Sequence, residues 1–255
     1  MVWLAPASSP GLAREPFSKE LGGVAAASLS RSSVCLSRSP SASPAASGRH
    51  CRGRSVASVF LLLSVGGVVS SRRDAAGLEM AAAANLITRS VDHRDFPDRE
   101  SFENALTGAI VPLAPDRLIL AGFMRILSDS FVNRFSPSIL NVHPSLLPDF
   151  RGLDTHRRAL ERGDACAGAS IHVVTPDLDA GPVIARVRVP IRKADSPDTL
   201  ARRVLAAEHL LFPEVLKWDA AGRLVLEREQ VMLDHRPLPA TGIDLRVDRE
   251  ELVPC

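Results

Sequence analysis

From residue 65 onward, short apolar segments alternate with helix-forming segments. Strand-like runs at 118–121, 139–142 and 183–189 are separated by helical runs such as 99–113 and 155–162. This alternation predicts a mainly parallel sheet, because parallel strands need crossover connections and helices supply them. We therefore expect an α/β fold with a Rossmann-like sheet flanked by helices. Functional side chains should gather at the carboxyl ends of its strands.

The first 60 residues have a different composition from the rest. They are rich in Ser, Ala, Arg and Pro, and residues 1–73 carry ten Lys, Arg and His but only Glu15 and Glu20 as acids. Because such a low-complexity segment offers few large apolar side chains for a core, we predict that residues 1–60 are disordered or non-native. Three origins fit the composition: an organellar transit peptide, a solvated tail, or coding sequence read out of frame in a GC-rich gene.

The composition of the whole chain limits the classes of function. Its 45% apolar and 24% charged residues are typical of a globular protein, with a predicted folded domain at 61–242 and a tail at 243–255. The net charge of +2 gives no reason to expect a nucleic acid partner. The apolar run at 56–69 is shorter than the roughly 20 residues that span a bilayer, so we expect a buried strand and no membrane association.

Cysteine and histidine spacing bears on metals and compartment. Four scattered cysteines form no C-x-x-C pair, and the histidines show no paired spacing. We therefore expect no metal site, no disulfide framework and a reducing, cytoplasmic location. A plastid or another organelle is the alternative if the first 55 residues are a transit peptide.

The segment 141–150, Asn-Val-His-Pro-Ser-Leu-Leu-Pro-Asp-Phe, follows a predicted strand. Asn141 and His143 are two residues apart, so their side chains point to the same side of an extended strand. Asp179, in a later Leu-Asp-Ala-Gly-Pro loop, can supply a carboxylate to the imidazole. A structural histidine and a turn-forming aspartate are the alternatives. Together the three groups suit the stabilisation of an oxyanion and the transfer of a proton.

Four segments in this order resemble the phosphoribosylglycinamide formyltransferases, which are folate-dependent enzymes of purine synthesis. The resemblance runs from about residue 67 to about residue 242. The segments are 120–128 (Leu-Ala-Gly-Phe-Met-Arg-Ile-Leu-Ser), 141–148 (Asn-Val-His-Pro-Ser-Leu-Leu-Pro), 152–156 (Gly-Leu-Asp-Thr-His) and 177–182 (Asp-Leu-Asp-Ala-Gly-Pro).

The resemblance implies a formyltransferase fold and specific roles for the site residues. His143 would be the general acid, Asn141 would donate a second hydrogen bond to the oxyanion, and Asp179 would stabilise the protonated imidazole. Pro144 and Glu208 would contact the substrate, although Glu208 also reads as a surface residue. His172 either supports the site or belongs to the core. The implied folate contacts are Arg99, the backbone of Met124, Arg125, Ile126 and Leu127, and Asn141.

The resemblance implies formyl transfer from the co-substrate 10-formyltetrahydrofolate to the amine of 5-phosphoribosylglycinamide, in IMP biosynthesis. It implies small-molecule partners only, no metal, and a monomer or homodimer. Alternatives are a methionyl-tRNA formyltransferase, a formyltetrahydrofolate deformylase, or a catalytically impaired folate-binding variant. The impaired variant is an alternative because of a missing motif. The enzymes of this family begin with a strand and a Gly-x-Gly-Ser-Asn turn, whose backbone binds a phosphate at a helix N-terminus. No such turn stands in the sequence.

Overall fold

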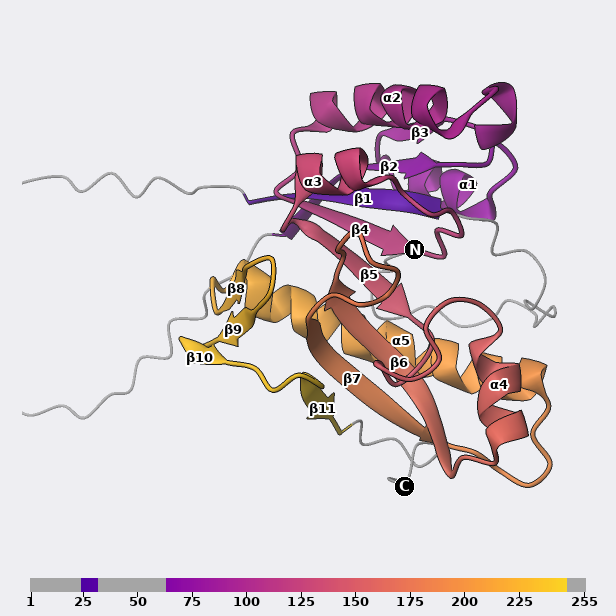
Figure 1. Cartoon of the computed structure of the whole chain (residues 1–255). Helices are drawn as coiled ribbons and strands as arrows, with labels where there is room; N and C mark the ends of the chain where they lie inside the picture. The colour runs from indigo at the N-terminus through magenta and orange to yellow at the C-terminus, as the bar shows by residue number, and fades with distance from the viewer. Residues whose placement is uncertain (1–23, 32–62, 247–255) are drawn as a thin grey trace, which may run out of the picture.

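The computed structural model describes residues 24–31 and 63–246, the first of these segments by its backbone alone (Figure 1). An eight-stranded sheet with strand order β11-β7-β6-β5-β4-β1-β2-β3 forms its centre. The strands are β1 (Val24–Arg31), β2 (Leu63–Ser70), β3 (Thr88–Ser90), β4 (Arg117–Ala121), β5 (Ile139–His143), β6 (Cys166–Val173), β7 (Val183–Pro190) and β11 (Ile243–Leu245). A small second sheet, in the order β10-β9-β8, contains β8 (Leu224–Leu226), β9 (Val231–Leu233) and β10 (Arg236–Pro237).

Most strands of the large sheet run in one direction, as predicted. The pairs β2–β3, β4–β5 and β7–β11 are parallel, whereas β1 and β6 are each antiparallel to both neighbours. Reversing only these two of the eight strands leaves six that point the same way. The predicted α/β fold with a mainly parallel sheet is therefore confirmed.

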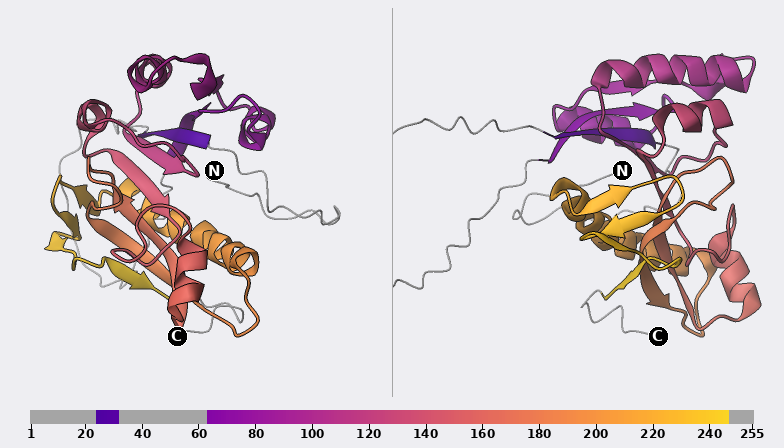
Figure 2. Two further views of the ribbon diagram at one scale, coloured as in Figure 1. Left: turned by 45° about the vertical axis from the view of Figure 1, so that its right-hand side comes forward. Right: turned by 60° about the vertical axis from the view of Figure 1, so that its left-hand side comes forward.

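The helices cover both faces of the sheet (Figures 1 and 2). On β2, Val68 packs against α1, whereas its neighbour Val69 packs against α2, because successive strand residues point to opposite faces. The longest helix, α5, runs along one face of β6 and β7. The helices are α1 (Ala76–Ala83), α2 (Arg99–Ile110), α3 (Asp129–Phe135), α4 (Thr155–Arg162) and α5 (Pro197–Ala220), with 3-10 turns at His93–Asp95 and Val111–Leu113.

Helix α5 shows how local sequence sets an element. It begins with a capping box between Ser196 and Thr199, and Pro197 stands at its first position, where no backbone N–H is needed. Its apolar stripe is fully buried and joins strand residues in the main core. The stripe consists of Leu200, Val204, Ala207, Leu211 and Val215.

Two element boundaries differ from prediction. The helix expected over 99–113 stops at Ile110 and continues as a 3-10 turn that contains Pro112, which cannot donate a helical hydrogen bond. The apolar pair Leu86-Ile87 predicts a short strand, but the strand begins instead at Thr88, although the Ile87 carbonyl accepts one hydrogen bond from Val68.

Both ends of the chain contribute strands that were not expected. Val24–Arg31, within the predicted disordered segment, forms β1 between β2 and β4. The other residues of 1–60 lie outside the described ranges. The backbone groups of β2 and β4 need partners, and almost any extended segment can supply them. Similarly, Ile243–Leu245 of the predicted tail pairs with β7.

In the described ranges, no helix is long and apolar enough to cross a membrane.

Candidate functional site

The site is built on the register between β5 and β6. Asn141 lies opposite His172, and His143 lies opposite Ser170. Because side chains alternate along a strand, these four polar side chains share one face of the sheet. Leu140 and Val173 are paired on the other face, where α5 packs. The carboxyl end of β5 therefore carries a polar cluster backed by a packed core.

His143 is buried between two acceptor oxygens. Its Nε2 lies 2.9 Å from the carbonyl oxygen of Phe150, and its Nδ1 lies 3.4 Å from Oδ2 of Asp179. A ring protonated at both nitrogens can donate to both oxygens. The structure thus brings the predicted histidine and carboxylate together, although they are 36 residues apart in the sequence. It places a proton donor at the end of β5.

Asp179 is fixed by its backbone as well as by its partners. It adopts a left-handed conformation with φ of +47°, which aspartate tolerates better than most residues. Its Oδ2 also accepts a hydrogen bond of 2.9 Å from the backbone N–H of Gly152. Only 11% of the side chain is exposed, so the charge-assisted bond is protected from solvent. Asp177, two residues earlier, is exposed.

His172 orients Asn141. Burial lowers the pKa of His172 to about 4, so the ring is neutral at pH 7. Its Nδ1 faces the carbonyl oxygen of Val173 at 3.0 Å and therefore carries the proton. The bare Nε2 then accepts from the amide nitrogen of Asn141 at 3.1 Å. Sequence left His172 undecided between support and core, and the structure gives it a contact to a site residue.

The residues with implied folate contacts surround a cavity of about 510 Å³, which is lined by Arg99, Met124, Arg125 and Ile126. Met124 and Ile126 are 66% and 65% exposed, so their side chains lie outside the core. The Leu127 side chain is instead buried in the core beside α2 and α3. This segment follows β4, the parallel neighbour of β5, so both strands end at the same edge of the sheet.

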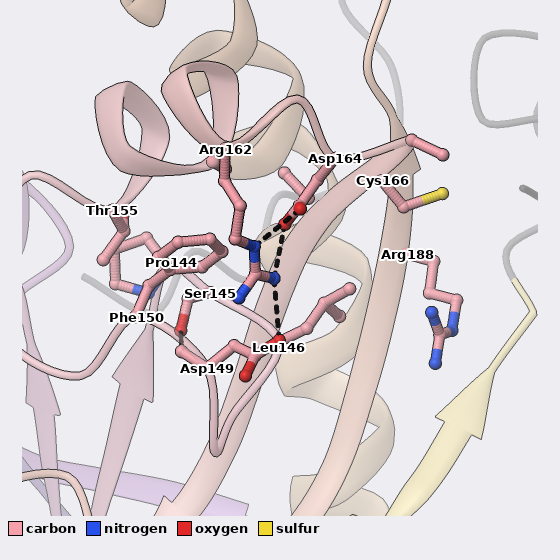
Figure 3. A pocket seen from close by; sticks show the side chains of 13 residues that line it. Pro144, Ser145, Leu146, Asp149, Phe150, Thr155, Arg162, Asp164, Cys166 and Arg188 are labelled. Carbon is pink, nitrogen blue, oxygen red and sulfur yellow. Dashed lines mark hydrogen bonds and ion pairs between the residues drawn. The ribbon is translucent and has the colours of Figure 1, made fainter.

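The two residues with implied substrate contacts lie apart from this cavity. Pro144 follows His143 and lines a second cavity of about 300 Å³ (Figure 3). Glu208 is half-buried on α5, which packs on the opposite face of the sheet from Asn141 and His143, and burial raises its pKa to about 7. Within residues 63–246, no hydrogen bond joins Glu208 to Asn141, His143 or Asp179.

Comparison with protein families identifies this arrangement. A family model described as formyl transferase matches residues 51–216. The chain belongs to the formyl transferase family. The match includes the Asn141–His143 strand, the Asp179 loop and the cavity-lining segment after β4.

Individual relatives of this formyl transferase agree with the family match. It is 45% identical to the phosphoribosylglycinamide formyltransferase of Escherichia coli K12 over 179 residues, which cover 70% of this chain and 84% of that one. The solved structure of the Coxiella burnetii phosphoribosylglycinamide formyltransferase matches with a TM-score of 0.69 and 45% identity, over 73% of this chain and 88% of that chain. A formyltetrahydrofolate deformylase of Pseudomonas syringae matches at 25% identity and TM-score 0.61, over 66% and 56% of the two chains.

Two features of this formyl transferase site were missed from the sequence. The carbonyl of Phe150 and the N–H of Gly152 are backbone groups, so their residue types carry no signal of the contacts they make with His143 and Asp179. In addition, Cys166 takes part in a disulfide bond, contrary to the expectation of reduced cysteines; the three other cysteines lie outside the described ranges.

The loop that carries Asp179 also contains Gly181, where no side chain fits. A Cβ added there would lie 1.9 Å from the carbonyl oxygen of Val173, so Gly181→Ala must displace the loop that carries Asp179. We expect kcat to fall at least about tenfold, because small misplacement of catalytic groups is costly. We expect a loss of about 1–3 kcal/mol in the free energy of unfolding, from the steric overlap. Steady-state kinetics and thermal unfolding measure these effects.

The control is Gly108→Ala on α2, where an added Cβ meets nothing within 4 Å. Alanine favours helix over glycine by up to about 1 kcal/mol, so this variant should be neutral or stabilised. Wild-type activity and stability in Gly181→Ala would show that the loop is not held as described.

Proposed function

We propose that this formyl transferase transfers the formyl group of 10-formyltetrahydrofolate to the amine of 5-phosphoribosylglycinamide, a step of IMP biosynthesis. The observation that carries the proposal is the group formed by Asn141, His143 and Asp179 at the carboxyl end of β5. The adjacent end of β4 leads into the cavity that contains Met124 and Ile126. The names of the two relatives that are 45% identical support the same reaction.

The geometry suits a direct transfer. When the amine attacks the formyl carbon, negative charge develops on the formyl oxygen. Asn141 donates its second amide N–H to this oxygen, since its first is donated to His172, and the Nε2–H of His143 donates to it by exchanging the Phe150 carbonyl oxygen for the formyl oxygen. The new C–N bond forms first and gives a tetrahedral intermediate. As its oxyanion re-forms the carbonyl, the bond from carbon to N10 breaks, and the proton lost by the amine is passed to N10. Asp179 holds the positive charge on His143 through this step. Such chemistry requires proximity and charge stabilisation, and no side chain becomes covalently modified.

In this proposal, Arg99 and the backbone of Met124, Arg125, Ile126 and Leu127 bind the folate, and Pro144 and Glu208 contact the glycinamide substrate. The enzyme acts on small molecules in the cytoplasm, as a monomer or a homodimer. The Rossmann-like sheet serves as the scaffold that presents the ends of β4 and β5 together.

An assay with and without the amine tests the proposal. With both substrates, we expect a formylated glycinamide product by mass spectrometry, and with 10-formyltetrahydrofolate alone we expect no formate above the uncatalysed rate. A deformylase would release formate in the absence of amine, because water would be the acceptor. Folate binding without either product would identify a catalytically impaired binding protein.

A further inference from the structure

The loop between β5 and α4, residues 144–154, contacts both His143 and Asp179 through its backbone. The Phe150 carbonyl oxygen lies 2.9 Å from Nε2 of His143, and the Gly152 N–H donates to Asp179 at 2.9 Å. These two contacts are only two residues apart in the chain. A shift of this short stretch would therefore move the acceptor of the imidazole and the donor to its carboxylate at the same time.

Phe150 needs external support to keep this position. Its φ of +53° lies in the left-handed region, which an aromatic residue occupies only when its surroundings hold it there. The Phe150 ring packs against the main core on one side and borders the cavity of about 300 Å³ on another. The ring is only half-buried. Further contacts on its open side therefore help to hold the residue whose carbonyl faces His143.

Two arginines of α4, one helical turn apart, supply the support. The guanidinium carbon of Arg162 lies 4.1 Å from the centre of the Phe150 ring, and that of Arg158 lies 5.3 Å from it, both within the range of cation–π contact. Arg158 also donates to the carbonyl oxygens of Arg151, at 2.7 Å, and Leu153, at 3.2 Å. The same helix thus holds the ring of Phe150 and the backbone on both sides of Gly152.

Arg162 is in turn fixed by two carboxylates (Figure 3). Its Nε and Nη2 donate to Asp164 at 2.6 Å, and Nη2 also donates to Asp149 at 2.8 Å. Asp149 belongs to the loop and directly precedes Phe150. The planar guanidinium of Arg162 therefore contacts two adjacent loop residues: it forms an ion pair with Asp149 and stacks on the ring of Phe150.

We propose that Arg158 and Arg162 are positioning residues, which hold Phe150 and Gly152 so that His143 and Asp179 keep their geometry. Neither arginine touches the reacting atoms in this role, and neither was singled out from the sequence. The inference rests on the proposed function for its effect on kcat, but the position of the imidazole is testable without any turnover.

The test uses the full chain with Arg158→Met and Arg162→Met, separately and together, because methionine keeps an apolar stem and loses the guanidinium. Arg157→Met is the matched control. In the described ranges, Arg157 on the same helix pairs with the side chains of Asp154, at the end of the loop, and Glu161, and no hydrogen bond or ring contact joins it to the loop backbone or to Phe150. Arg162→Lys is the conservative variant. Lysine retains the charge above the ring but cannot form the planar two-donor contact with Asp164.

The readouts are kcat and KM for both substrates, the pH profile of kcat, and the side-chain NMR signals of His143 across pH. We expect the double variant to lose at least about tenfold in kcat, with the KM for 10-formyltetrahydrofolate within about twofold. We expect the His143 signals and the pH profile to shift, and Arg162→Lys to recover part of both. Arg157→Met should match the wild type in every readout.

His143 signals and a kcat that are unchanged in the double variant would overturn the inference. A loss of kcat that only follows a loss of folded protein, measured by circular dichroism, would overturn it too. If the wild type transfers no formyl group, the proposed function fails, yet the NMR comparison still decides whether the two arginines position His143.

Discussion

Replacing His143 by alanine is expected to lower kcat by about 10²–10⁴-fold, the usual contribution of a positioned general acid. The affinity for 10-formyltetrahydrofolate should stay within a few-fold, because the ring is buried between Phe150 and Asp179 and lies outside the residues that line the larger cavity. The His143 side chain then interacts with the reacting groups only in the transition state. Removing it therefore reduces kcat and leaves binding of the formyl donor intact. Steady-state kinetics and a folate-binding titration measure the two quantities.

The same group should respond to mutation as a unit. Asp179→Ala leaves His143 without the carboxylate at 3.4 Å, so adding it to His143→Ala should cost little more than the single change. His235→Asn is a suitable control, because His235 is exposed and asparagine tolerates its φ of +64°. An unchanged kcat in His143→Ala, in a preparation with demonstrated activity, would remove His143 from the catalytic role.

The position of Asn141 and His143 could be predicted from the sequence because a strand has a strict two-residue period. The strand that starts at Ile139 ends at His143, so the side on which both residues lie follows from local pattern alone. The partnership of Asn141 with His172 could not be predicted in this way. It depends on the antiparallel register of β5 and β6, two strands that are separated in the sequence by a long connection containing α4.

Loop contacts were beyond prediction for a related reason. The path of residues 149–154 depends on left-handed conformations at Phe150, Gly152 and Asp154. Glycine favours this conformation and aspartate tolerates it, but nothing in the sequence predicts it at Phe150. Asp179 was found through the resemblance to a family, although its left-handed turn is common for aspartate. By contrast, α5 can be predicted from the sequence alone, because its cap at Ser196 with Pro197 and its apolar stripe are local signals.

The strand β1 has a direct consequence for the second substrate. It is antiparallel to β2 and β4, so its amino end, at Val24, lies beside Ser70 and Ala121 at the edge of the sheet where β4 and β5 end. Its carboxyl end, at Arg31, therefore leaves the sheet at the opposite edge. A turn that follows this strand cannot present the N-terminus of a helix next to His143. At the edge where His143 lies, β2 leads through residues 71–75 into α1, but this turn contains no glycine. The described ranges therefore hold no strand followed by a glycine-rich turn and a helix beside β1 at this edge.

We therefore expect a KM for 5-phosphoribosylglycinamide at least about tenfold above that of the Escherichia coli relative assayed in parallel. Each charge-assisted hydrogen bond to a phosphate contributes roughly 1.5–3 kcal/mol, and about 1.4 kcal/mol corresponds to a factor of ten. The dissociation constant for 10-formyltetrahydrofolate should differ little between the two proteins, since the cavity formed by Arg99, Met124, Arg125 and Ile126 is present.

A chimera separates this explanation from a general loss of activity. Replacing residues 1–62 by a strand that runs parallel to β2 and β4, followed by a Gly-x-Gly-Ser-Asn turn and a helix, would place backbone N–H groups and the positive end of a helix dipole at the edge where His143 lies. The KM for the phosphorylated substrate should then fall at least about tenfold with kcat little changed, because the binding contribution is similar in the ground state and the transition state. A matched variant with Ser and Asn of the turn replaced by alanine should lose part of the gain. If the unmodified chain already has the KM of the relative, the phosphate is bound by other residues and the reversed strand is no obstacle to substrate binding.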